Sequence, residues 1–180
     1  MKISVIGAGA MGGAMVQGML KGKTFANDDI TVADPSAKAL EQFDGTGATI
    51  TTDNTQAATA SDIVAVVVKP WLVESVLKGI KDNLDYAHQM LIVVAAGVSS
   101  AQIKEWLDKG DGTMISLFLV IPNTAIAVMS SMTFVVPVGA SEEQTAIVKT
   151  LFDEMGSTLI TEERLLAAGT TLASCGIAYA

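Results

Sequence analysis

Three glycines near the start of the chain, Gly7, Gly9 and Gly12, have the spacing of a phosphate-binding turn. They form a G-x-G-x-x-G hexapeptide, and an acid, Asp34, follows about 20 residues later. In this pattern the first glycine allows a tight turn, the second lets the backbone approach a pyrophosphate, and the third lets a helix pack closely on a sheet. The carboxylate can accept a hydrogen bond from a ribose hydroxyl. The chemistry indicated is therefore the binding of a dinucleotide.

The segments around this turn agree with that interpretation. Residues 2–6 are expected to form a buried strand, residues 13–20 the helix that opens at the turn, and residues 30–33 a second strand. Unpaired N–H groups and the dipole at the start of such a helix favour negative charge. A glycine-rich turn alone is weak evidence, so the prediction depends on the agreement of strand, turn, helix and acid.

Short apolar segments alternate with helical segments along the rest of the chain. This alternation predicts an α/β protein with a parallel, doubly wound sheet of the Rossmann type. The clearest strand is residues 63–68, which is apolar on both faces, as expected of a central strand covered by helices. Further strands are expected over residues 49–52, 90–94, 113–121 and 132–136, and further helices over residues 37–43, 55–60, 72–84, 99–107, 141–155 and 165–180.

Composition restricts the classes of function. The formal net charge of −8 makes a nucleic-acid backbone an unsuitable partner, and no apolar run reaches the ~18 residues of a membrane span. A single cysteine, Cys175, excludes an internal disulfide framework and fits a reducing cytoplasm. No Cys/His cluster has the spacing of metal ligands. We therefore expect a cytoplasmic protein without a nucleic-acid, membrane or metal partner.

The candidate functional residues follow the expected strands. In a doubly wound sheet, ligands bind outside the carboxyl ends of the strands, near the point where the strand order reverses. The segments at those ends are Gly7 to Gly12, Asp34-Pro35-Ser36, Lys69-Pro70, Ala95-Ala96-Gly97 and Pro122-Asn123-Thr124.

These motifs, in this order and at this spacing, resemble those of pyrroline-5-carboxylate reductases. The resemblance rests on the G-A-G-A-M-G turn, Val68-Lys69-Pro70, Ala95-Ala96-Gly97-Val98-Ser99, Ile121-Pro122-Asn123-Thr124, Met132-Thr133 and Ser174-Cys175-Gly176-Ile177-Ala178-Tyr179. It covers essentially the whole chain. It implies reduction of the cyclic imine 1-pyrroline-5-carboxylate to proline by NAD(P)H, in an enzyme that forms homodimers or larger oligomers through a helical C-terminal domain.

The resemblance also implies a role for each motif. The pyrophosphate would lie on Gly7, Ala8, Gly9, Ala10, Met11 and Gly12. The adenosine end would contact Asp34, Pro35, Ser36 and Asn54, and the cofactor's sugar would contact Val68, Lys69 and Pro70. The nicotinamide would lie beside Ala95, Ala96, Gly97, Pro122, Asn123 and Thr124, with Asn123 and Thr124 also on the substrate side. Hydride transfer to an imine carbon needs mainly orientation, so no side chain is assigned as catalytic.

The residues leave the choice between NAD and NADP open. Asp34 would accept a hydrogen bond from the 2′-hydroxyl of NAD and repel the 2′-phosphate of NADP. Ser36 and Lys38 follow closely, and a hydroxyl together with a cation could hold that phosphate.

The chain departs from the family pattern at several positions. Leu119 stands where arginine is common, Ala125 replaces a proline and Ser131 replaces a glycine. In the family, the helical domain continues and carries an S-P-G-G-x-T segment that completes the substrate pocket. We expect residues 1–160 to form the dinucleotide-binding domain and residues 161–180 to begin a truncated α-helical dimerisation domain. Such a chain should bind nucleotide but turn over poorly.

Two other functions are compatible with the residues. One is another imine reductase or a deazaflavin-dependent reductase of the same superfamily, which Leu119 favours. The other is a non-catalytic nucleotide-binding module, which the short chain favours. His88 is interpreted as a surface residue and Cys175 as a helix-packing residue. Trp71 is interpreted as a packing residue that could border the cofactor.

Overall fold

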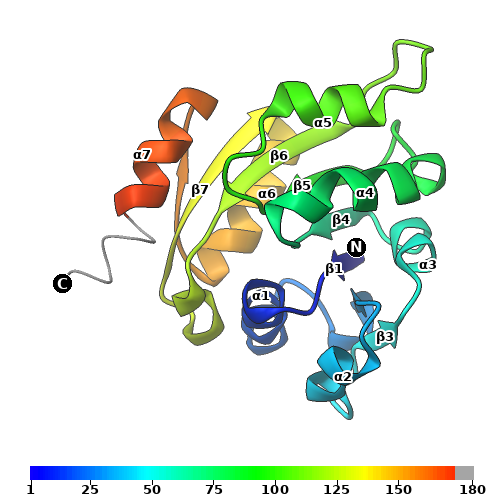
Figure 1. Cartoon of the computed structure of the whole chain (residues 1–180). Coiled ribbons are helices and arrows are strands. Elements are labelled where there is room, and N and C mark those ends of the chain that lie inside the picture. The colour runs from blue at the N-terminus through cyan, green and yellow to red at the C-terminus, as the bar shows by residue number, and fades with distance from the viewer. Residues whose placement is uncertain (173–180) are drawn as a thin grey trace.

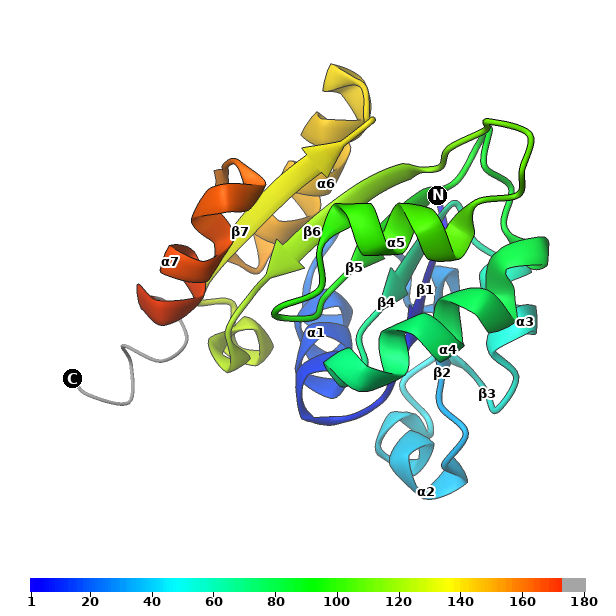
Figure 2. The same cartoon turned by 45° about the horizontal axis from the view of Figure 1, so that its top comes forward.

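The computed structural model describes residues 1–172. Within these residues, one sheet has the strand order β3-β2-β1-β4-β5-β6-β7-β8 (Figures 1 and 2). Its strands are β1 (Ile3–Ile6), β2 (Ile30–Ala33), β3 (Thr49–Thr51), β4 (Ile63–Val66), β5 (Met90–Val93), β6 (Ser116–Ile121), β7 (Ser131–Val138) and β8 (Gly156–Ile160). The order reverses at β1 and β4, which is the topological switch point of a doubly wound fold.

Helices connect most of the strands. The α-helices are α1 (Ala10–Lys21), α2 (Ala37–Leu40), α3 (Asn54–Thr59), α4 (Pro70–Ile80), α5 (Ser100–Leu107), α6 (Glu142–Glu154) and α7 (Leu166–Thr170). The 3₁₀ turns are η1 (Asn27–Asp29), η2 (Glu41–Phe43), η3 (Lys81–Asn83), η4 (Thr124–Val128) and η5 (Glu163–Leu165). Ser99 and Ser141 are the N-caps of α5 and α6, and each forms a capping box. The serine hydroxyl accepts the backbone N–H of a glutamine three residues later, and the side chain of that glutamine accepts the backbone N–H of the serine.

The Rossmann-type α/β class predicted from the sequence is confirmed for this sheet. Strands β1 to β6 are parallel, and β1 pairs with both β2 and β4. All four residues of β4 are buried, as predicted for a central strand with helices on both sides.

The prediction of an entirely parallel sheet was wrong at one edge. β7 runs antiparallel to β6, with Leu119 opposite Val136, and β8 is parallel to β7. The connection from Pro122 to Ser130 contains only η4, whereas a parallel crossover needs about a dozen residues or more. The chain therefore turns back directly.

Two hydrophobic cores lie on opposite faces of the sheet. In β4, Ile63 and Ala65 face the core that includes α1 and α6, whereas Val64 and Val66 face the core that includes α3, α4 and α5. Figures 1 and 2 show α4 and α5 together on one side of the strands. This two-sided covering leaves the carboxyl ends of the strands as the place where loops can form a site.

The last described segments differ from the sequence prediction. The pattern does not predict β8, because Leu159 and Ile160 are its only large apolar residues. The expected helix over residues 165–180 is described only as η5, α7 and the residues up to 172. Cys175 and the motif Ser174 to Tyr179 lie outside the described residues. Within residues 1–172, no helix is both long and apolar enough to cross a membrane.

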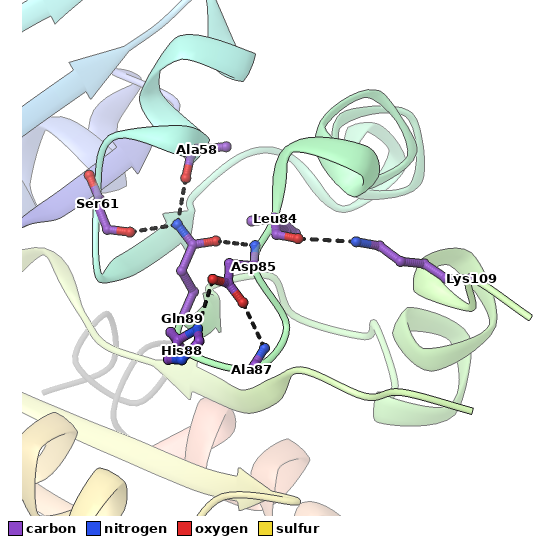
Figure 3. Close-up of polar contacts among 8 residues, drawn as sticks. All are labelled: Ala58, Ser61, Leu84, Asp85, Ala87, His88, Gln89 and Lys109. Carbon is purple, nitrogen blue, oxygen red and sulfur yellow. Dashed lines mark hydrogen bonds and ion pairs between the residues drawn. The ribbon is translucent and has the colours of Figure 1, made fainter. Parts of the chain in front are cut away.

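A buried glutamine ties the loops together at the amino ends of β4 and β5 (Figure 3). The Gln89 side chain is 6% exposed. Its Nε2 donates to the carbonyl oxygens of Ala58 and Ser61 at 2.7 and 2.5 Å, and its Oε1 accepts the Asp85 N–H at 2.8 Å. Nearby, His88 is exposed and its Nδ1 lies 2.8 Å from Asp85 Oδ2, which confirms its surface position. The contact with His88, together with the Ala87 N–H, holds the pKa of Asp85 below its usual value.

Candidate functional site

The turn between β1 and α1 requires glycine at two positions. Gly7 has a φ of +111°, and a Cβ there would lie 2.2 Å from the carbonyl oxygen of Val67. A Cβ on Gly12 would lie 1.9 Å from the carbonyl oxygen of Gly7. Both distances are far below a van der Waals contact, so the tight turn and the close helix packing exclude any side chain.

Gly9 differs from these two glycines because the space beside it is open. A Cβ on Gly9 would meet no atom within 4 Å, and its φ of −68° suits any residue. Gly9 is also the N-cap of α1, and no side chain caps that helix. The first N–H groups of α1 therefore face a clear approach, which is the arrangement that binds an anion at a helix start.

The carboxylate of Asp34 connects this turn to the end of β2. Its Oδ2 accepts the backbone N–H of Ala8 at 2.8 Å, and its Oδ1 accepts the backbone N–H of Ser36 at 2.9 Å. Because Ala8 is buried and Asp34 is half-buried, the carboxylate has a fixed position beside the glycine turn.

A groove follows the carboxyl edge of the sheet from this turn. It consists of three adjoining cavities of about 370, 200 and 250 Å³. The first cavity is lined by Gly7, Gly9, Ala10, Met11, Asp34, Val67, Val68, Lys69, Leu72, Val94 and Thr124. The second shares Met11, Val68, Lys69 and Val94 with the first, and the third shares Ala95, Ala96, Ile121 and Thr170 with the second. The cavities therefore adjoin one another along this edge of the sheet.

Most of the sequence-predicted candidates meet in this groove. Gly7, Gly9, Ala10, Met11, Asp34, Val68, Lys69 and Thr124 line its first cavity, Pro70 lines the second and Gly97 the third. Ala95 and Ala96 line both the second and the third. Ala8 and Gly12 are buried beneath the turn, and Pro35 and Ser36 are exposed beyond Asp34.

Asn54 lies in a separate cleft between α3 and α4. This cleft has a volume of about 460 Å³ and is lined by residues that include Thr52, Asn54, Ser75 and Gly79. The Oδ1 atom of Asn54 is buried and has no hydrogen-bond partner. The preceding residue, Asp53, caps α3 instead. The Thr55 hydroxyl and the N–H groups of Thr55 and Gln56 hold the pKa of Asp53 below its usual value.

Asn123 has a structural contact that the sequence did not predict. Its side-chain oxygen accepts the Ala125 N–H at 3.0 Å and starts η4. The residue is 6% exposed, whereas the exposed Thr124 lines the first cavity. The Pro122-Asn123-Thr124 segment therefore presents Pro122 and Thr124 to the groove.

Two parts of the groove wall were missed by sequence reasoning. Leu72 lies in the first turn of α4, which begins at Pro70 and not at Leu72 as predicted; proline at the first helical position was the available signal. The second part comes from the end of the described chain, where Glu163, Leu166, Ala167 and Thr170 line the third cavity. Glu163 accepts the N–H and the hydroxyl of Ser100 at 2.8 and 2.5 Å and so links this segment to α5.

The carboxylates and other groups of the described residues do not form a metal site. Within residues 1–172, no group of three or more His, Cys, Asp or Glu side chains could hold a metal ion. What the groove offers is a glycine turn with open helix amides at one end, a fixed carboxylate beside it and a single lysine, Lys69, along its length. The side chain of Lys69 is exposed.

Comparison with known proteins gives a family match. Residues 2–97, which include the glycine turn, Asp34, Lys69 and Ala95 to Gly97, match the family described as NADP oxidoreductase, coenzyme F420-dependent. The matched region is more than half of the 180 residues.

Individual relatives carry a more specific name. The chain is 30% identical to pyrroline-5-carboxylate reductase of Arabidopsis thaliana over 99% of its own length and 63% of the relative's length. The structure of a pyrroline-5-carboxylate reductase from Coxiella burnetii is 25% identical, with a TM-score of 0.89 over 99% of this chain and 65% of that chain. The NADP-bound pyrroline carboxylate reductase of Plasmodium falciparum, at 22% identity, shares the fold with a TM-score of 0.87 over 99% of this chain and 64% of that one. These likenesses confirm the resemblance, and the chain spans less than two thirds of each relative's length.

Proposed function

The chain belongs to the family of coenzyme F420-dependent NADP oxidoreductases, and from this premise we propose that it is the nucleotide-binding part of a pyrroline-5-carboxylate reductase. The reaction is hydride transfer from NAD(P)H to the C=N bond of 1-pyrroline-5-carboxylate, giving proline. The observation that supports it most is the groove of adjoining cavities, which runs from a glycine turn at the switch point to the exits of β5 and β6. A dinucleotide needs an extended site of this kind.

The residues of the first cavity fit a dinucleotide. The open space beside Gly9 and the uncapped start of α1 suit a pyrophosphate. Asp34 presents a fixed acceptor to a ribose hydroxyl, and Lys69 adds a positive charge along the cofactor. A bound nicotinamide cofactor supplies the hydride. The chain's own task is to orient it, with the backbone of Gly7 to Gly12 at the phosphates.

The second and third cavities suit the reacting end. Their walls are mainly small or apolar, from Ala95, Ala96, Gly97 and Ile121. Such walls allow a flat ring to lie close to the backbone and exclude water from the hydride path. Ser99, Thr124 and Thr170 are the hydroxyl-bearing residues that line the groove. We assign no acid or base to the reaction, since orientation alone accounts for the transfer.

The remaining assignments extend the same proposal. Asn54, from the cleft between α3 and α4, contacts the adenosine end together with Pro35 and Ser36. Asn123 positions Thr124 through its cap of η4. Residues 1–160 form the nucleotide-binding domain, and residues 161–180 begin a helical domain through which the whole protein forms homodimers or larger oligomers. The protein acts in the cytoplasm on a small imine and has no nucleic-acid partner.

One observation favours a second candidate, a deazaflavin-dependent reductase. The matching family model is described by coenzyme F420 and covers the nucleotide-binding half of the chain. Leu119 does not strengthen this alternative. It is 3% exposed in the core beside α5, opposite Val136 in the sheet. Leucine in place of arginine at this position therefore leaves a packed interior and no group in the groove without a partner.

The assay that tests the proposal uses a longer protein that contains residues 1–180. Absorbance of NADH or NADPH is followed after addition of 1-pyrroline-5-carboxylate, and proline is measured as product. We expect oxidation of the nucleotide with an equal amount of proline formed. The parallel assay supplies reduced coenzyme F420 and NADP as substrates. Activity in that assay alone would identify the deazaflavin, and not the imine, as the substrate. Nucleotide binding without either activity would indicate a non-catalytic nucleotide-binding module.

A further inference from the structure

The side chain of Glu163 joins two segments that are far apart in the sequence. Glu163 is the first residue of η5, after the last strand, and Ser100 is the first residue of α5. One carboxylate oxygen of Glu163 accepts the Ser100 N–H at 2.8 Å, and the other accepts the Ser100 hydroxyl at 2.5 Å. Hydrogen bonds to an ionised acceptor are stronger than those between neutral groups. The start of α5 therefore holds the start of the last described segment.

The start of α5 is a favourable place for this carboxylate. The first N–H groups of a helix have no partner within the helix, and the dipole there favours negative charge. The Ser99 hydroxyl accepts the Gln102 N–H as the N-cap of α5, and Glu163 accepts the Ser100 N–H. Glu163 thus completes the capping of α5 from outside the helix.

Other contacts attach the same segment to β7. The Thr161 N–H donates to the Val135 carbonyl oxygen at 2.9 Å. Gly169 is buried so closely against the ring of Phe134 that a Cβ there would lie 2.9 Å from it. Glu163 adds an attachment to α5, which follows β5 in the chain. The segment is therefore fixed relative to the exit of β5 as well as to β7.

The third cavity of the groove lies between the two segments that Glu163 joins. One wall comes from the exit of β5 and the start of α5, and another comes from η5 and α7; the residues are Ala95 to Ser99 on the first and Glu163, Leu166, Ala167 and Thr170 on the second. Among the described residues that line this cavity, only Glu163 carries a charge. The bonds from Glu163 to Ser100 therefore set the width of the cavity.

We propose that Glu163 is a positioning residue of the reacting end, because it holds η5 and α7 over the third cavity through Ser100. This inference rests on the proposed function, which places the reacting end of the cofactor and the imine in the second and third cavities. Glu163 itself transfers neither hydride nor proton. Without the attachment the segment moves away from Ala95 to Gly97, the cavity widens, and a bound ring loses the orientation that hydride transfer needs.

The chain offers a direct measurement of this attachment. Arg164, the neighbour of Glu163, is its only arginine. A protease specific for arginine therefore cuts the 180-residue chain at one bond. The rate of that cut follows the population in which the segment is open, provided that opening and closing are fast relative to cleavage. Cleavage at Arg164 thus reports the attachment independently of any enzymatic activity.

Ser100→Pro tests the attachment without changing the sequence around Arg164. Proline removes the N–H and the hydroxyl together, and it is well accepted at the first position of a helix. Ser99 already has the extended backbone that a following proline requires. We expect the variant to be cut about tenfold faster than the wild type, since a charged acceptor loses both donors. Ser100→Ala loses the hydroxyl alone and should be cut about threefold faster, which keeps the test valid if proline disturbs α5.

Glu142→Pro is the matched control. Glu142 is the first residue of α6, which starts with the same kind of capping box as α5. Its cleavage rate at Arg164 should stay within about twofold of the wild type, and thermal unfolding shows that each variant is folded. Cleavage of both Ser100 variants at the wild-type rate would overturn the proposal. Equal acceleration in Glu142→Pro would also overturn it, because the effect would then be a general one of proline at a helix start.

Turnover by a longer protein that contains residues 1–180 separates positioning from proton transfer. Glu163→Ala should lower kcat for 1-pyrroline-5-carboxylate about tenfold and leave the KM for the nucleotide within about twofold. Glu163→Gln should recover most of kcat, because its amide can accept the Ser100 N–H and bond to the hydroxyl. The exposed neighbour Glu162 has the same charge, and Glu162→Ala should keep the wild-type kcat.

Two results in the turnover assay would contradict the role given to Glu163. A glutamine variant as slow as the alanine variant would show that the carboxylate itself takes part in the reaction. Wild-type kcat in Glu163→Ala would show that the attachment does not position the reacting end. Absence of imine reduction by the wild type would instead overturn the proposed function, and the cleavage rates at Arg164 would still decide whether Ser100 and Glu163 hold the segment.

Discussion

The carboxyl ends of the strands form one edge of the sheet and their amino ends the other, and the two differ in how their polar groups are satisfied. At the carboxyl edge, α1 and α4 begin at Gly9 and Lys69 without a side-chain cap. The space beside Gly9 is open, and the cavities of the groove lie along this edge. The helices α3, α5 and α6 are each capped by an aspartate or serine side chain, and the cap of α5, Ser99, lines the third cavity. The helix starts at the first cavity, those of α1 and α4, are thus left available to a ligand.

At the amino edge, side chains close the loops. Gln89 joins the end of α3 to the loop before β5 (Figure 3). The Lys2 N–H donates to Asp62 at 2.7 Å, and the Tyr86 hydroxyl donates to the Leu107 carbonyl at 2.6 Å. Lys109 donates to the Leu84 carbonyl at 3.0 Å, and its ammonium lies 3.9 Å from the centre of the Tyr86 ring.

The difference separates binding from stability. Open donors at the carboxyl edge contribute little to folding and are retained for a ligand. Satisfied groups at the amino edge contribute to folding and have no access to the groove. Substitutions at the two edges should therefore affect different measurements, except where the glycine turn serves both purposes.

Gly7→Ala should have the largest effect, because Gly7 belongs to both the fold and the site. The new Cβ would lie 2.2 Å from the Val67 carbonyl oxygen at a φ of +111°, and we expect a loss of about 3 kcal/mol or more in stability together with loss of nucleotide binding. Urea unfolding and nucleotide titration measure the two effects. Gly79→Ala is the control: it has nothing within 4 Å and should gain about 0.5–1 kcal/mol in the helix. Normal stability of Gly7→Ala would show that the turn is less constrained than described.

Gln89→Leu should reduce stability alone. It leaves the Ala58 and Ser61 carbonyls and the Asp85 N–H without their partner, which costs about 2–4 kcal/mol. Urea unfolding measures this loss, and nucleotide affinity should stay within about twofold of the wild type. Gln17→Leu, at an exposed position, should change stability by less than about 0.5 kcal/mol. A folded Gln89→Leu protein that no longer binds nucleotide would contradict the conclusion that the amino edge contributes to stability and not to nucleotide binding.

Tyr86 should give a smaller effect that depends on pH. Burial, followed by the nearby charges of Asp82, Asp111 and Asp108, raises the pKa of Tyr86 from 10.0 to about 12. The folded state keeps the phenol proton longer than the unfolded state, so this contribution is complete below pH 10 and is lost as the pH rises through about 12. After allowance for solvent screening, about 1–2 kcal/mol is at stake. Stability measured from pH 9 to 12 should fall less steeply in Tyr86→Phe, and identical slopes would contradict the assignment.

The sequence predicted the parts of the site that depend on local chemistry. The tight turn at Gly7, the close packing at Gly12 and the acid at the end of β2 are local requirements of a strand, a turn and a helix. Parallel strands place their carboxyl ends at one edge, which is why Lys69 and Ala95 could be assigned to the same groove. No local pattern reveals that Asp34 bonds to the Ala8 N–H, because that contact joins two loops.

The features that were not predicted depend on contacts between distant segments. The antiparallel direction of β7 follows from the short connection after Pro122, and β8 has too few apolar residues to be recognised before it pairs with β7. Thr170 reaches the groove because its segment packs on the sheet, where a Cβ on Gly169 would lie 2.9 Å from the ring of Phe134. Such contacts depend on the whole fold.

The most direct test of the nucleotide site is the binding of NADH to Gly9→Ala compared with the wild type. The added methyl group meets no protein atom within 4 Å, so the thermal unfolding curve should be unchanged. The same methyl group fills the space that the pyrophosphate would use, and NADH affinity should fall about tenfold or more. Unchanged affinity in this variant would contradict the placement of the dinucleotide at the glycine turn.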